Sequence, residues 1–84
     1  MKATRLDLEL MTRPGCHLCD DMKQVIHEAA RGLDVRLREI DVSESVDLES
    51  RFGSDVPVLL VNGREAFRHR ATVEELRLRF REEV

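Results

Sequence analysis

Apolar and polar positions near the start of the chain follow first the period of a strand and then that of a helix. At residues 6–11 three leucines alternate with mostly charged residues, and the turn-forming stretch at 12–15 ends this strand. From Cys19 to about Arg31 apolar residues recur at steps of three and four, which indicates a helix with Gly32 behind it as a stop. Two cysteines therefore fall where the predicted strand gives way to the predicted helix.

The middle of the chain predicts a second strand and a second helix. Residues 35–40 alternate as a strand whose polar face carries Arg36 and Arg38, as an exposed edge strand would. Residues 43–52 contain Val46, Leu48 and Phe52 with a glycine behind them, a spacing consistent with a short helix.

The last third predicts a hairpin and a final helix. Residues 58–61 are wholly apolar, as in a strand buried on both faces, and Asn62-Gly63 favours a tight turn into a return strand over 64–68. Thr72 and Glu75 form a capping box before a helix that begins at Val73. The expected order is strand, helix, strand, helix, strand, strand, helix, which is an α/β fold.

Length and composition fit one folded domain over residues 1–84. A chain of 84 residues has room for a single small core, and 42% hydrophobic with 37% charged residues suits a folded soluble protein better than a disordered one. The longest apolar run, 56–61, is too short to span a bilayer, and residues 1–9 lack the apolar core of a secretory signal. We therefore expect a cytoplasmic protein without a membrane partner.

The charge balance argues against a nucleic-acid partner. The formal net charge is −3 and the pI is near 5.6, whereas phosphate contacts need a concentrated excess of Lys and Arg. The C-terminal third is rich in arginine, but glutamates are interleaved with the arginines. We expect an ion-paired surface there, and an anionic partner for this face is the alternative.

The chemistry-bearing motif is the pair Cys16 and Cys19. A bridge that closes so short a loop constrains the unfolded chain very little, so redox chemistry or a metal site are the functional interpretations, and an inert or regulatory pair is the structural one. A structural zinc needs four ligands, and only His17 lies near the cysteines in sequence. We therefore predict redox chemistry and no metal, with an iron–sulfur cluster bridged between two chains as a minor option.

The two cysteines are predicted to have different roles. Cys16 is placed at a helix start, where free N–H groups and the positive end of the dipole stabilise a thiolate. Arg13 on the same loop, and His17 if protonated, would add positive charge. Cys19 lies about one helical turn further on and should be more buried. Cys16 is thus the expected nucleophile and Cys19 the resolving thiol.

The chain resembles glutaredoxins and the wider thioredoxin superfamily over nearly its whole length. The resemblance rests on the motif at 13–19 after a first strand, the Val56-Pro57 pair before a buried strand, the Asn62-Gly63 hairpin and the last helix. It implies a four-stranded mixed sheet flanked by three helices, with a cis Pro57 facing the cysteines. The backbone of Val56 would then be presented to a substrate as a strand edge.

Two departures from the glutaredoxin pattern put a glutathione site in doubt. Glutaredoxins typically carry Tyr or Phe before the second cysteine, where this chain has Leu18, and a Gly-Gly-x-Asp segment after the last strand, where it has residues 68–71. Arg13, Arg68 or Arg70 would have to meet the glutathione carboxylates instead. The chain also lacks the tryptophan of thioredoxins and has Leu10 where they have a buried aspartate.

The expected function is thiol–disulfide exchange on a disulfide-bearing protein or small molecule by a monomer without a metal or organic cofactor. Glutathione, as a co-substrate, or a flavoenzyme of the thioredoxin-reductase type would supply the electrons. The alternative is a non-catalytic binding module that docks a partner through the Val56-Pro57 groove or the arginine-rich C-terminal face.

Overall fold

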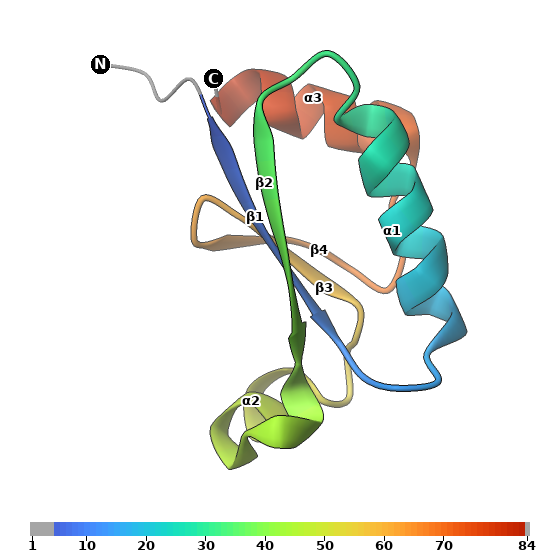
Figure 1. Cartoon of the computed structure of the whole chain (residues 1–84), viewed down its shortest axis with the longest axis vertical. Helices are drawn as coiled ribbons and strands as arrows, with labels where there is room; N and C mark the ends of the chain where they lie inside the picture. The colour runs from blue at the N-terminus through green and yellow to red at the C-terminus, as the bar shows by residue number, and fades with distance from the viewer. Residues whose placement is uncertain (1–4, 84) are drawn as a thin grey trace.

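A computed structural model describes residues 5–83 as one four-stranded mixed sheet with three α-helices (Figure 1). The elements in chain order are β1 (Leu6–Thr12), α1 (His17–Ala29), β2 (Val35–Asp41), the 3-10 helix η1 (Val42–Glu44), α2 (Val46–Phe52), β3 (Val58–Val61), β4 (Arg64–Arg68) and α3 (Val73–Glu83). The strand order is β2-β1-β3-β4, with β2 parallel to β1 and the other neighbours antiparallel. The predicted thioredoxin-like fold is confirmed.

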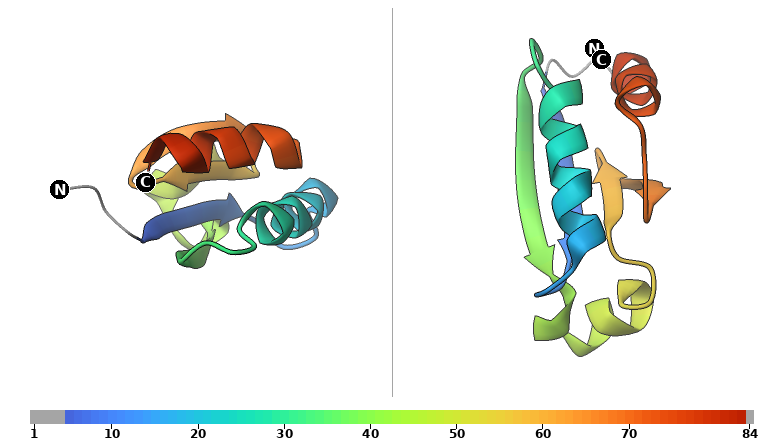
Figure 2. Two further views of the ribbon diagram at one scale, coloured as in Figure 1. Left: turned by 90° about the horizontal axis from the view of Figure 1, so that it is seen from above. Right: turned by 90° about the vertical axis from the view of Figure 1, so that its right-hand side faces the viewer.

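Helices α1 and α3 cover the same face of the sheet (Figure 2). The alternating leucines of β1 point to this face, where they are no more than 1% exposed. They pack with residues of β3, α1 and α3, namely Leu59, Val61, Met22, Ile26, Ala29, Leu76 and Phe80. The period-two pattern of the first strand thus provides the centre of the main core.

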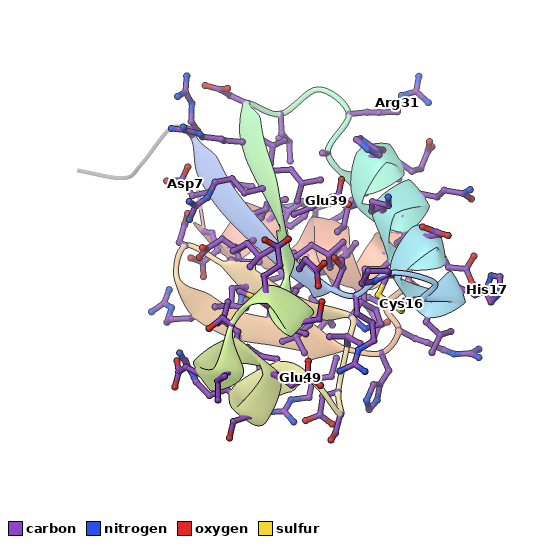
Figure 3. The ribbon with its side chains drawn as sticks, turned by 60° about the horizontal axis from the view of Figure 1, so that its bottom comes forward. Asp7, Cys16, His17, Arg31, Glu39 and Glu49 are labelled. Carbon is purple, nitrogen blue, oxygen red and sulfur yellow. A yellow bond between two sulfur atoms is a disulfide. The ribbon has the colours of Figure 1, made fainter. Side chains whose placement is uncertain are left out.

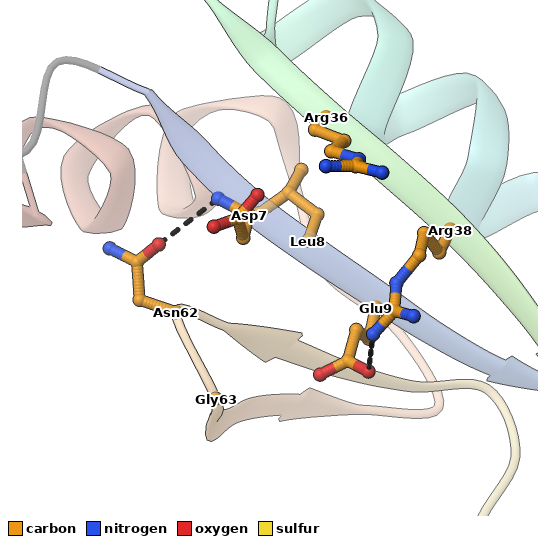
Figure 4. A pocket seen from close by; sticks show the side chains of 7 residues that line it. All are labelled: Asp7, Leu8, Glu9, Arg36, Arg38, Asn62 and Gly63. Carbon is orange, nitrogen blue, oxygen red and sulfur yellow. Dashed lines mark hydrogen bonds and ion pairs between the residues drawn. The ribbon is translucent and has the colours of Figure 1, made fainter.

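The opposite face is covered by α2 only at the end of the sheet next to the cysteines. There Met11 and Val58 pack with Val42 and Phe52 in a second, smaller core. The rest of this face is polar, and a depression near the start of β1 is lined by Asp7, Glu9, Arg36, Arg38 and neighbouring residues (Figure 4). Strand β2 lies at the sheet edge, as the arginines on its polar face predict.

Two turn and capping motifs form as predicted. The N–H of Glu75 donates to Thr72 Oγ1 at 3.1 Å, and Glu75 Oε1 accepts from the N–H of Thr72 at 2.9 Å. Asn62 and Gly63 join β3 to β4 with φ values of 51° and 83°, the left-handed region in which glycine has no steric penalty.

The helix predicted over residues 43–52 is divided in the structure. Asp41 accepts a hydrogen bond from the N–H of Ser43 at 2.9 Å and begins η1, and Ser45 Oγ then accepts from the N–H of Leu48 at 3.2 Å and begins α2. Two separate side-chain caps therefore replace one continuous helix. None of the helices between Arg5 and Glu83 is both long and apolar enough to cross a bilayer.

Candidate functional site

Cys16 and Cys19 form a disulfide at the start of α1 (Figure 3). Their Cα atoms lie 5.2 Å apart. Cys16 is the N-cap residue, and its Sγ accepts a hydrogen bond from the N–H of Cys19 at 3.1 Å. Helix α1 begins at His17, two residues earlier than the apolar pattern predicts. The first cysteine therefore lies at the helix terminus, where the helix dipole favours negative charge.

The two sulfur-bearing residues differ in burial. Cys19 is 2% exposed and belongs to the buried residues of α1, whereas Cys16 is partly exposed at the surface. A reagent in solution thus reaches Cys16 more readily than Cys19. This asymmetry agrees with the roles that the sequence predicts for them.

Pro57 is buried, and its peptide bond with Val56 is cis, as the resemblance implies. Strand register pairs Val58 with Met11, so the Val56-Pro57 segment and the loop that leads to Cys16 leave the sheet at the same end. Within residues 5–83, no backbone hydrogen bond outside the strands and helices engages the N–H or C=O of Val56. Both backbone polar groups of Val56 thus lack a backbone partner outside the strands and helices of the described residues, and the residue is partly exposed.

Arg13 contacts α2 and its C-cap, and His17 is exposed to solvent. The Arg13 guanidinium forms an ion pair with Glu49 and donates to the carbonyl of Gly53 at 2.9 Å. Arg13 still lines the depression that both cysteines line, so it stays near the site with its charge largely matched. His17 is the exposed first residue of α1 (Figure 3). A role of Arg13 or His17 in stabilising the thiolate remains a prediction.

The depression beside the cysteines contains a second matched cation. Lys23 lies 3.3 Å from Glu39 and 3.6 Å from Asp20, and all three residues line it. Hydrogen bonding to the Glu39 carboxylate, with its charge, holds the pKa of Lys23 above its ordinary value. Each cation of the depression thus has a carboxylate partner.

An apolar groove lies on the other side of the CxxC motif. Leu18, Met22, Val25 and Ala71 line it together with Asp21, His69 and Arg70. Its walls are α1 and the loop between β4 and α3, so three of the four residues at the place of the glutaredoxin Gly-Gly-x-Asp segment, residues 69–71, line this groove.

The arginines of the C-terminal third are mostly ion-paired. Arg64 and Arg79 contact Glu83, and Arg77 contacts Glu28. Arg68 contacts Glu65 and Asp55, and its hydrogen bond to Glu65 holds the pKa of that carboxyl below its ordinary value. Among residues 5–83, Arg70 and Arg81 have no carboxylate within ion-pairing distance. Most arginines of this face are thus ion-paired, as the sequence predicts.

Sequence reasoning missed Asp55, Glu49 and the placement of His69. Asp55 lies directly before Val56, where its carboxylate contacts Arg68 and His69. The side chain of His69 is 53% exposed, and the residue also contacts this loop. No short-range motif marks these pairs, because the partners lie 13 or more positions apart in the chain. Between Arg5 and Glu83 the structure contains no cluster of three or more metal-binding side chains.

The sheet order, the CxxC disulfide at a helix start and the cis-proline loop at the same end of the sheet define a protein of the thioredoxin-fold superfamily. Within that class, the chain belongs to the glutaredoxin-like domain family (DUF836), whose match covers residues 7–81. The resemblance found in the sequence is therefore confirmed.

Relatives and solved structures agree with this assignment. The glutaredoxin-like protein YDR286C homolog of Dictyostelium discoideum is 29% identical over 77 residues, covering 84% of this chain and 71% of that protein. The X-ray structure of protein XcR50 from X. campestris is similar with a TM-score of 0.74 and 30% identity, covering 89% of this chain and 96% of that one. A thioredoxin mutant from Halobacterium salinarum matches with a TM-score of 0.65 and 21% identity, covering 93% of this chain and 74% of that one, which shows the fold alone.

Proposed function

We propose that this glutaredoxin-like protein is a thiol–disulfide oxidoreductase in which Cys16 attacks and Cys19 resolves. The observation that carries the proposal is the position of Cys16 Sγ at the N-terminus of α1, 3.1 Å from the N–H of Cys19. Such a position lowers the pKa of a thiol and so supplies the thiolate that attacks disulfides. The substrate is a disulfide-bearing protein or small molecule.

The reaction transfers two electrons from the reduced pair to the substrate. The Cys16 thiolate attacks one sulfur of the substrate disulfide, the other substrate sulfur leaves as a thiolate and takes a proton, and a mixed disulfide forms. The Cys19 thiol then loses its proton to solvent and attacks Cys16 Sγ as the thiolate. The second substrate sulfur leaves as a thiolate, the substrate is fully reduced and the Cys16–Cys19 disulfide closes. Two molecules of glutathione, or a flavoenzyme of the thioredoxin-reductase type, return the two electrons.

The open backbone of Val56 supports a role in binding the substrate. An extended peptide beside Cys16 can add to this loop as a further strand, donating to the C=O of Val56 and accepting from its N–H. Pro57, which follows Val56 directly, is buried just before the start of β3. Main-chain pairing of this kind suits protein disulfides with varied side chains.

Cysteine variants test the proposal. Wild-type protein, reduced and then separated from its reductant, should reduce a peptide disulfide with stoichiometric closure of Cys16–Cys19. Cys16→Ser should lose this reaction, and Cys19→Ser should accumulate covalent adducts on Cys16. A full rate in Cys16→Ser, or adducts formed on Cys19, would contradict the assignment.

The same variants separate this proposal from the binding-module alternative. A docking module would hold its partner as tightly after Cys16→Ser as before, because its contacts lie on Val56, Pro57 or the arginine-rich face. An oxidoreductase loses its covalent intermediate with the same change.

A further inference from the structure

We propose that Asp55, Arg68 and His69 form a clamp that positions the backbone of Val56 for the substrate peptide. We call these three residues the loop clamp. The inference rests on the proposed function, and it assigns positioning residues to that site. None of the three is proposed to touch the reacting sulfurs.

On the N-terminal side of Val56, the loop is held by contacts of the Asp55 side chain with Arg68 and His69. Asp55 Oδ2 accepts from Arg68 Nη1 at 2.7 Å, and Asp55 Oδ1 lies 3.5 Å from His69 Nε2. The backbone N–H of Asp55 also donates to the carbonyl of Phe52 at 2.8 Å, at the end of α2. The Asp55 side chain thus joins the end of β4 to the loop after α2.

On the C-terminal side of Val56, the loop is held by a hydrogen bond from the backbone of His69. The N–H of His69 donates to the carbonyl of Pro57 at 2.8 Å. His69 has a φ of +66°, a left-handed conformation that is uncommon for a residue with a side chain. Such conformations have a cost and persist where the surrounding contacts over-determine them. Here the conformation is accompanied by contacts to both Asp55 and Pro57.

Val56 lies between Asp55 and Pro57, both of which use a backbone group in a hydrogen bond, whereas no backbone hydrogen bond outside the strands and helices of the described residues involves Val56. Arg68 is itself held by Glu65 on the same strand, so the guanidinium that meets Asp55 has little freedom to leave it. The side chains of Asp55, Arg68 and His69 are 32%, 46% and 53% exposed, and ion pairs this exposed add little to global stability. Their effect should therefore appear in the placement of the loop more than in the stability of the fold.

Steady-state kinetics with a peptide disulfide, using the full chain recycled by an excess of a small dithiol and with the rate of the dithiol alone subtracted, tests the clamp. Asp55→Asn keeps the shape of the side chain and removes its charge, and Arg68→Gln removes the other partner. Each should raise KM about fivefold with little change in kcat, and the double variant should be no worse than either single one because both act through one contact. Alkylation of Cys16 by iodoacetamide should keep its rate. Asp34→Asn, which breaks an ion pair with Arg5, is the matched control and should behave as wild type.

Amide hydrogen exchange provides a second readout that does not depend on activity. The His69 amide should exchange about tenfold faster in Asp55→Asn than in wild type, because the loop that carries its acceptor is released. An unchanged KM together with unchanged His69 protection would overturn the clamp. Faster exchange of this amide would support the clamp even if wild type reduced no disulfide, and that inactivity would count against the proposed function alone. Additive losses in the double variant would show that Asp55 and Arg68 act separately and would also overturn it.

Discussion

The Sγ atom of Cys16 accepts a hydrogen bond from the backbone N–H of Cys19 at 3.1 Å, so the first cysteine caps the helix that buries the second. We expect the same N–H, with the other free donors of the first turn, to face the Cys16 sulfur in the reduced protein as well. These donors stabilise a thiolate more than a thiol. One local contact therefore links helix capping to the reactivity of the site.

The first prediction concerns the acidity of Cys16. In a Cys19→Ser variant, the midpoint of thiolate absorbance at 240 nm should lie below about 8.5, the value of a free thiol, because the helix terminus favours the anion. In the converse Cys16→Ser variant, Cys19 should titrate at higher pH, since burial disfavours its charged form. A Cys16 midpoint at or above the free-thiol value would contradict the proposed nucleophile.

A second prediction follows from the ion pair between Arg13 and Glu49. Because Glu49 matches the Arg13 charge, Arg13→Met should raise the Cys16 midpoint by less than about one pH unit, and Glu49→Gln should lower it by freeing that charge. Both variants are measured in the Cys19→Ser background by the same absorbance titration.

Glu44→Gln is the control for these two variants, because Glu44 lies in the neighbouring η1 and is exposed. Its Cys16 midpoint should equal that of the parent. If Arg13→Met and Glu49→Gln shift the midpoint in the same direction, the charge of Arg13 does not act on Cys16.

The third prediction concerns Glu83 of α3, whose carboxylate accepts hydrogen bonds from Asn62 in the β3–β4 turn and from Arg64 at the start of β4. A hydrogen bond from the Asn62 amide at 3.2 Å, together with Arg64 and Arg79, holds the pKa of Glu83 below its ordinary value. A carboxyl with a lowered folded pKa adds stability above its unfolded pKa, and this is lost as pH falls through the folded value. Glu83→Gln should therefore lower the urea midpoint at pH 7, and the gap to wild type should close below about pH 4.

Glu82→Gln removes the same charge from the neighbouring exposed position and should change the urea midpoint little at either pH. A gap for Glu83→Gln that stays constant between pH 7 and pH 3 would show that its charge is not the stabilising feature.

The elements that sequence could predict are those whose cause is local. The leucine alternation of β1, the capping box at Thr72 and the Asn62-Gly63 turn each depend on residues a few positions apart, and each forms. The loop clamp depends instead on which side chain at the end of β4 reaches Asp55. A register shift between Leu59 and Leu60 changes the pairing of β3 with β4, and no short-range pattern encodes it. The partner of Arg13 was missed for the same reason, since Glu49 lies 36 positions away.

The last prediction is that glutathione recycles this protein poorly. The aromatic residue and the Gly-Gly-x-Asp segment of glutaredoxins are replaced by Leu18 and residues 68–71. Of these, Leu18 and residues 69–71 line the apolar groove. Losing a few glutathione hydrogen bonds, each worth roughly 0.5 to 1.5 kcal/mol, or 1.5 to 3 when charged, should weaken the complex at least tenfold. Two of the three arginines that could compensate are engaged, Arg13 by Glu49 and Arg68 by Asp55 and Glu65.

Arg70 is the third of these arginines, and it lines the groove without a carboxylate partner among residues 5–83. Whatever glutathione turnover remains should therefore fall further in Arg70→Glu, whereas Arg81→Glu, the same change at an exposed position on α3, should leave it unchanged. The measurement is reduction of a small glutathione mixed disulfide, compared at equal concentration with a glutaredoxin that carries the full motif. Equal rates for the two proteins would place this chain among the glutathione-dependent enzymes. A single flexible arginine contributes little without fixed geometry, so we expect the loss of the motif to outweigh it.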